Sequence, residues 1–154
     1  MAINLPPNYT IEQYLDCLSV FLERRHLRKT YERYLTAETI YKMENRFTCD
    51  ILKKCLDKQK CHVSRSTVYH TLNLLMEAEM IIKHNFSVKS VPQYEKVRIR
   101  ENSNHVYVED TDTVIDFSDV RIEPIIKDIE EKYNVYVIRH SFTIYCTNKE
   151  EHNK

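Results

Sequence analysis

The sequence predicts an α+β chain with a helical first part, a two-stranded hairpin, and a smaller unit of strands around one helix. Two observations predict this order. Apolar residues recur at helical spacing in four stretches before residue 80, and short β-rich runs separated by turn residues dominate after it. The charge also changes: residues 1–100 hold 17 Lys and Arg against 11 Asp and Glu, and residues 101–154 hold 6 against 12. We therefore expect two domains, residues 1–97 and 98–154.

The composition excludes several classes of protein. Apolar residues make up 42% of the 154 residues and charged residues 30%, as in a globular protein. The chain has no glycine, which excludes P-loops and Gly-rich dinucleotide-binding turns. No apolar run is long enough to span a bilayer and no signal-peptide layout is present, so we expect a cytoplasmic protein without a membrane segment. The five cysteines form no C-x-x-C pair, so we expect neither a disulfide framework nor a zinc ribbon.

Three helices are predicted in the first 60 residues. Thr10 and Gln13 form a capping-box pattern before a helix whose apolar residues recur over residues 11–22. A second helix is expected from about residue 30 to 44, and a third after its cap, Thr48. We expect the inner face of the third helix to consist of Ile51, Leu52, Cys55 and Leu56.

Residues 61–80 predict the second helix of a helix-turn-helix pair. Ser64 is a suitable N-cap, and Val68, Leu72 and Leu75 follow at the spacing of a buried helical face. Another face carries side chains that can contact phosphates and base edges: Arg65, Tyr69 and Asn73, with Ser66 and His70 beside them. An amphipathic surface helix explains the same pattern, but the short link to the preceding helix and the basic first domain favour DNA recognition.

A hairpin is predicted after this helix. Residues 80–86 and 91–97 have the composition of two strands, and the Ser/Lys-containing residues 87–90 form the tip between them. Such a hairpin is the wing of a winged-helix DNA-binding domain. Lys89 at the tip is placed to contact a phosphate, as is Arg28 in the basic segment that follows the first helix.

The second domain is predicted to be a β-β-α-β unit. Short strands are expected at residues 106–108 and 114–117, a helix capped by Ser118 or Asp119, and one long strand at residues 135–146. The helix has an apolar stripe formed by Ile122, Ile125, Ile126, Ile129 and Tyr133. A unit of this size cannot cover both this stripe and the apolar strand face by itself. We therefore expect this domain to form a homodimer.

These motifs resemble those of the ferric uptake regulator (Fur) family of metal-responsive repressors. The matching stretches follow in the family's order over residues 22–146: residues 66–75, residues 84–86, Tyr94-Glu95, residues 114–119 and residues 139–141. The resemblance implies a homodimeric transcriptional repressor of metal or iron homeostasis that binds AT-rich palindromic operators in double-stranded DNA. It places Tyr69 against a thymine, adds Thr67 to the DNA contacts, and matches Arg28 to a basic residue that reaches the minor groove. His70 stands where the family usually has arginine.

The resemblance also implies a metal site at a hinge between the two domains. The family's regulatory ligands match Glu95, His105 and Asp116, whereas Arg46 and Ser103 stand at two other ligand positions. Arginine cannot bind a cation because its guanidinium has no lone pair to offer. Its charge can replace the ion beside the carboxylates, repel the ion, or point to solvent or a phosphate. Zn²⁺, Fe²⁺ and Mn²⁺ all accept imidazole and carboxylate, so the ligands do not identify the metal.

Two further metal sites of the family lack some of their usual ligands in this chain. A second site, in the dimerisation domain, matches Glu123 and His140, but Asn102 and Asn104 stand where a histidine and a carboxylate are usual. The family's four-cysteine zinc site is not expected, because the positions of its first cysteine pair are non-cysteine residues and Cys146 has no partner nearby.

Two other functions fit some of the residues. The cysteines and histidines leave open a haem- or thiol-responsive regulator with little dependence on divalent metal, since some Fur relatives respond to haem. An enzyme would place His105, Glu123 and His140 around a catalytic zinc. No nucleophile or oxyanion-hole motif accompanies these three residues, so we expect the protein not to be an enzyme.

Overall fold

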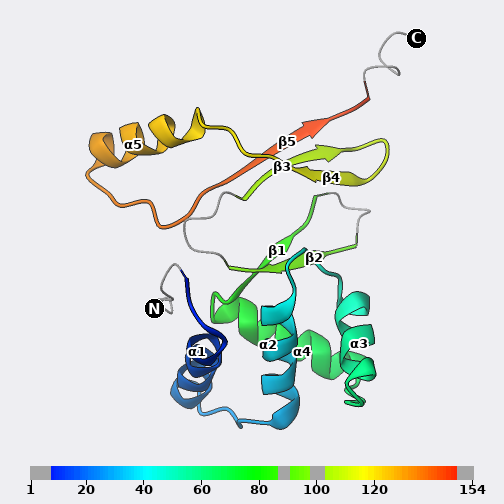
Figure 1. Cartoon of the computed structure of the whole chain (residues 1–154). Coiled ribbons are helices and arrows are strands. Elements are labelled where there is room, and N and C mark those ends of the chain that lie inside the picture. The colour runs from blue at the N-terminus through cyan, green and yellow to red at the C-terminus, as the bar shows by residue number, and fades with distance from the viewer. Residues whose placement is uncertain (1–7, 87–90, 98–102, 149–154) are drawn as a thin grey trace. The chain divides into compact units, whose positions relative to one another are not determined.

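The computed structural model describes residues 8–86, 91–97 and 103–148, and the chain divides into two compact units, residues 1–98 and 99–154. The first unit contains helices α1 (Ile11–Arg24), α2 (Tyr31–Lys42), α3 (Cys49–Lys58) and α4 (Arg65–Glu77), followed by strands β1 (Ile81–His84) and β2 (Gln93–Lys96). The second contains β3 (Ser103–Val108), β4 (Thr113–Asp116), α5 (Ile122–Tyr133) and β5 (Ser141–Cys146) (Figure 1). The predicted α+β class is confirmed. No described helix is long and apolar enough to cross a membrane.

The helices of the first unit begin where the sequence predicts. Thr10 and Gln13 make both hydrogen bonds of a capping box, and the hydroxyls of Thr48 and Ser64 accept from first-turn N–H groups of α3 and α4. Because the chain has no glycine, other residues take the left-handed conformation just after α1, α3 and α4. These are His26, Lys60 and Glu79, with φ of 54°, 59° and 54°. The helix ends are thus formed at the cost of steric strain that glycine would avoid.

The core of the first unit is closed. Its large, fully buried apolar residues come from all four helices and the residue before β1: Tyr14, Leu18, Leu22, Ile40, Leu52, Leu56, Val68, Leu72, Leu75 and Met80. The predicted inner face of α3 is wrong at Ile51, which is 47% exposed, because the core contacts of this short helix are made by Leu52 and Leu56 one turn apart.

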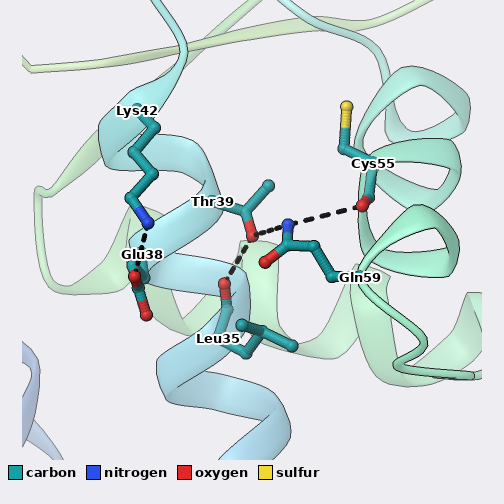
Figure 2. Close-up of polar contacts among 6 residues, drawn as sticks. All are labelled: Leu35, Glu38, Thr39, Lys42, Cys55 and Gln59. Carbon is teal, nitrogen blue, oxygen red and sulfur yellow. Dashed lines mark hydrogen bonds and ion pairs between the residues drawn. The ribbon is translucent and has the colours of Figure 1, made fainter.

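A polar contact joins α2 to the end of α3 (Figure 2). The side-chain amide of Gln59 donates to Thr39 Oγ1 at 2.9 Å and to the carbonyl of Cys55 at 3.3 Å. The buried Thr39 hydroxyl in turn donates to the carbonyl of Leu35 at 2.7 Å. This chain of bonds satisfies a hydroxyl inside the helical unit and ties the C-terminal end of α3 to α2.

Strands β1 and β2 form the predicted hairpin and are shorter than predicted. They pair antiparallel, with Ile82 opposite Glu95 and His84 opposite Gln93. Phe47, in the link between α2 and α3, exchanges two backbone hydrogen bonds with Tyr94 and so attaches that link to the hairpin. The tip at residues 87–90, with Lys89, lies outside the described residues.

The second unit has the predicted β-β-α-β order. Its sheet has the strand order β4-β3-β5, with β3 and β5 parallel. Two expectations are wrong. Residues 135–140 are not strand, because β3 offers pairing partners only to residues from Ser141 onward. Helix α5 is preceded by Arg121 without a side-chain cap, and Asp119 accepts instead from the Arg121 N–H at 2.9 Å, in a turn before the helix.

Candidate DNA-facing helix and metal-ligand pairs

Helix α4 turns its predicted contact face outward. Its buried side is formed by Val68, Leu72 and Leu75, and Tyr69 is 41% exposed on another side. The other exposed residues of that face are Arg65, Ser66, His70 and Asn73. Thr67 is half-buried, with its hydroxyl 2.7 Å from that of Ser64 at the N-cap. The helix therefore presents charge, hydroxyl, imidazole and amide groups to one side, as major-groove recognition requires.

The first residues of α3 hold two of these side chains. The guanidinium of Arg65 lies 2.7 Å from Asp50, and this carboxylate, together with a hydrogen bond to Tyr69, raises the pKa of Arg65. Burial raises the pKa of the Cys49 thiol, against the opposing effect of its hydrogen bond with Tyr69. Neither Cys49 nor Asp50 was predicted to belong to this surface. Helix periodicity alone could not show them, because the contact depends on how α3 packs against α4.

A pocket of about 430 Å³ lies beside α4, against the N-terminal part of α2. The residues that line it all carry a polar or charged group: Thr30, Glu32, Arg33, Ser66, Thr67, His70 and Thr71. The guanidinium of Arg33 also donates to the carbonyl of the exposed residue Arg28, in the link between α1 and α2. Three of the predicted DNA contacts, Ser66, Thr67 and His70, therefore share one pocket with a basic residue that the sequence did not single out.

Glu95, a predicted metal ligand, lies on the hairpin next to a histidine that was not predicted. The Nε2 atom of His84 is 3.0 Å from a carboxylate oxygen of Glu95, and the two side chains are only 10% and 20% exposed. The strand register brings them together, since His84 is two residues from Ile82, which faces Glu95. Alternation along two paired strands was a signal in the sequence that could have identified His84.

The other two predicted hinge ligands form a pair within the second unit. His105 and Asp116 are cross-strand partners on β3 and β4, and His105 Nδ1 lies 2.8 Å from Asp116 Oδ1. His105 is buried, whereas the Asp116 side chain is 71% exposed. When Nδ1–H donates a hydrogen bond to the carboxylate, the lone pair of the neutral imidazole is on Nε2. A carboxylate that orients an imidazole in this way is the usual neighbour of a metal-binding histidine.

Comparisons with known proteins identify the family. The family model described as "Ferric uptake regulator family" matches residues 24–145. The chain belongs to the ferric uptake regulator family. It is 33% identical over 100 residues to the ferric uptake regulation protein of Haemophilus influenzae, a match that spans 64% of this chain and 66% of the relative.

Solved structures of Fur proteins share the fold. The Helicobacter pylori regulator matches with a TM-score of 0.72 and 22% identity, over 95% of this chain and 96% of that one. The Vibrio cholerae regulator, whose structure shows a rearrangement of its DNA-binding domains, matches with a TM-score of 0.61 and 28% identity, over 82% and 96%. These relatives are regulators, not enzymes, as the sequence predicts.

The residues predicted for the second Fur site do not lie together as His84 and Glu95, or His105 and Asp116, do. Glu123 is exposed in the first turn of α5, and His140 is half-buried just before β5, with its ring 6.0 Å from that of Phe142. Among the described residues, no group of three potential ligands forms around either of them. Asn104 is buried, and its amide has no hydrogen-bond partner in the described parts of the chain. An amide in place of a carboxylate removes one anionic ligand, so a metal role for Glu123 and His140 stays a prediction.

Proposed function

We propose that this Fur family member is a homodimeric DNA-binding repressor of metal or iron homeostasis genes that recognises AT-rich palindromic operators and responds to a divalent metal. The observation that carries the proposal is the outward face of α4, with Arg65, Tyr69 and Asn73 opposite a closed core. A helix held by one side and exposed on the other can enter the major groove without unfolding its domain.

The side chains around α4 divide into two kinds of DNA contact. Tyr69 offers an aromatic edge to thymine methyls and therefore supports sequence discrimination. Arg28, Arg33 and His70 lie at or near the pocket beside α2, where cationic and donor groups favour a backbone phosphate. His70 stands where the family usually has arginine, and an imidazole lacks the planar fork of donors with which a guanidinium binds phosphate. The ion pair with Asp50 holds Arg65 in place, so a contact of Arg65 with DNA competes with this carboxylate.

Substitution of Tyr69 tests the DNA-binding role. An operator is first selected from random duplexes, and binding isotherms are then measured on that operator and on scrambled DNA. Tyr69→Ala should lose about 1–3 kcal/mol on the operator and little on scrambled DNA, because only the operator offers the thymine contact. Arg33→Gln is the matched variant that removes a proposed phosphate contact. It should weaken binding to both DNAs and reduce the salt dependence of binding by about one phosphate contact. Equal losses for Tyr69→Ala on both DNAs would remove Tyr69 from base recognition.

The metal is proposed to bind Glu95, His105 and Asp116. These residues supply the imidazole and carboxylate donors that Zn²⁺, Fe²⁺ and Mn²⁺ accept, and the hydrogen bond of His105 Nδ1 to Asp116 supports His105 as an oriented imidazole ligand. Arg46 does not belong to this donor set, and its guanidinium carbon lies 5.7 Å from the centre of the Phe86 ring.

Metal dependence is tested by operator binding with a chelator and with excess Mn²⁺, for the wild type and for Arg46→His. We expect a modest metal dependence in the wild type and a larger one in Arg46→His, because the new imidazole adds a ligand. Strong dependence that the substitution leaves unchanged would show that position 46 plays no part. A haem absorption band after haem titration, with no response to Mn²⁺, would instead support the haem-responsive alternative.

The homodimer is proposed to form through the second unit. Apolar side chains of α5, the following link and β5 are exposed: Ile125, Ile129, Tyr133, Val135, Tyr136, Ile138, Phe142 and Ile144. Helix α5 makes few contacts with the strands of its own sheet, so the sheet does not cover it (Figure 1). Exposed apolar side chains gathered on one helix, one link and one strand are typical of a protein interface, and a second copy supplies a matching surface.

A further inference from the structure

His84 and Glu95 project from the same face of the β1–β2 hairpin, with their reactive atoms close together. The distance from His84 Nε2 to Glu95 Oε1 is 3.0 Å, and the two side chains are shielded from most of the solvent. Both residues belong to the first unit, so their separation is set by the pairing of two neighbouring strands. This arrangement is therefore part of the hairpin itself.

The 3.0 Å separation suits two ligands of one ion. Ligand atoms about 2.1 Å from a metal lie about 3.0 Å apart when their bonds are at right angles, and about 3.4 Å apart in a tetrahedral site. A hydrogen bond between imidazole and carboxylate gives a similar distance, so the competing explanation is a purely structural pair. The two explanations differ in one measurable respect, which is the affinity for metal.

The surroundings of His84 hold its ring in place. The imidazole stacks on Phe86 with a centroid distance of 5.3 Å and an angle of 3° between the ring planes. Phe86 is buried and also carries the Arg46 guanidinium over its ring. A ring fixed by stacking loses little rotational freedom on binding a metal, which lowers the entropic cost of ligation. Arg46 and His84 thus both pack against the ring of Phe86. Of the two, only His84 has a lone pair that can bind a metal.

We propose that His84 is a metal ligand of this protein and supplies the imidazole that Arg46 cannot. This inference rests on the proposed metal response, and it deepens that response by adding a residue to Glu95, His105 and Asp116. With His84 the donor set contains two imidazoles and two carboxylates. A second nitrogen favours Zn²⁺, Fe²⁺ or Mn²⁺ over Mg²⁺ and Ca²⁺, which prefer oxygen ligands alone.

The experiment measures metal binding directly and does not depend on DNA. The full-length protein is stripped of metal and titrated with Mn²⁺ by electron paramagnetic resonance and with Co²⁺ by visible absorption, which reports the number and type of ligands. The variants are His84→Gln, His84→Phe and Glu95→Gln, and the control is His62→Gln, whose side chain is 85% exposed on the link between α3 and α4. Circular dichroism of each metal-free variant shows whether it is folded, and His84→Phe keeps an aromatic ring against Phe86.

We expect both His84 variants to bind Mn²⁺ and Co²⁺ at least about tenfold more weakly than the wild type, with a changed Co²⁺ spectrum, and the control to bind normally. Wild-type affinity and spectrum in the folded His84 variants would overturn the inference. If Glu95→Gln still weakened binding in that case, the proposed metal response would stand without His84. A wild-type protein that bound neither ion would overturn both.

Discussion

The two units of this chain differ in how far they bury their apolar side chains. In the first unit ten large apolar side chains from α1, α2, α3, α4 and the hairpin are fully buried, as named above. In the second unit Ile125, Phe142 and Ile144 remain 40–50% exposed, and Tyr107 and Ile122 are the buried apolar residues among those described. A four-helix arrangement with a hairpin closes around its own core, whereas one helix and a three-stranded sheet leave apolar faces open. The first unit therefore has the structure of a self-sufficient domain, and the second has exposed apolar faces of the kind that a protein interface covers.

The largest expected effect is on assembly. Replacing Phe142 and Ile144 together by Asp places two charges on the open face of β5, and we expect the dimer to dissociate because burying an unpaired carboxylate is costly. Sedimentation at micromolar concentration should give twice the 18.6 kDa chain mass for the wild type and the single mass for the variant. Ile51→Asp is the matched control, because Ile51 is equally exposed on the first unit. A monomeric wild type that still binds its operator tightly would contradict the proposed role of the second unit.

A smaller effect separates two neighbours on α3. Leu52→Ala should lower the free energy of unfolding by about 2–5 kcal/mol, because it leaves a cavity in a closed core. Ile51→Ala removes a similar volume from a surface position, and its effect should be about 0.5 kcal/mol. Urea unfolding followed by circular dichroism measures both. Similar losses at the two positions would mean that the core of the first unit is not the closed one described.

The smallest expected effect on stability concerns residues in the left-handed backbone conformation. The first unit uses His26, Lys60 and Glu79 at such positions, whereas the second uses Asp112 and Asn134, which tolerate this conformation better. Glu79→Gly should therefore raise the free energy of unfolding by about 1 kcal/mol, since glycine relieves the contact of Cβ with the backbone. Asn134→Gly, the control, should change it by less. If thermal unfolding shows the same shift for both, the strain assigned to the first unit is absent.

Most of the secondary structure was predictable from the sequence. Ser64 and Thr48 mark helix starts because a hydroxyl before an apolar repeat satisfies free N–H groups locally. The extent of β5 was not predictable in the same way. Residues 135–140 have strand composition, but a strand needs a partner, and β3 reaches only from Ser141 onward.

The sequence by itself also determined which chemical groups are available: a basic first half, a polar face of α4, and imidazoles and carboxylates, with five cysteines that form no C-x-x-C pair. The tertiary structure decided which groups meet. It placed Asp50 against Arg65 and Arg33 beside His70, neither of which follows from helical periodicity, and it fixed the strand register that brings His84 to Glu95. Periodicity reports which side of an element a residue occupies. Contacts between elements depend on packing angle and strand register, which arise only when the whole chain closes its core.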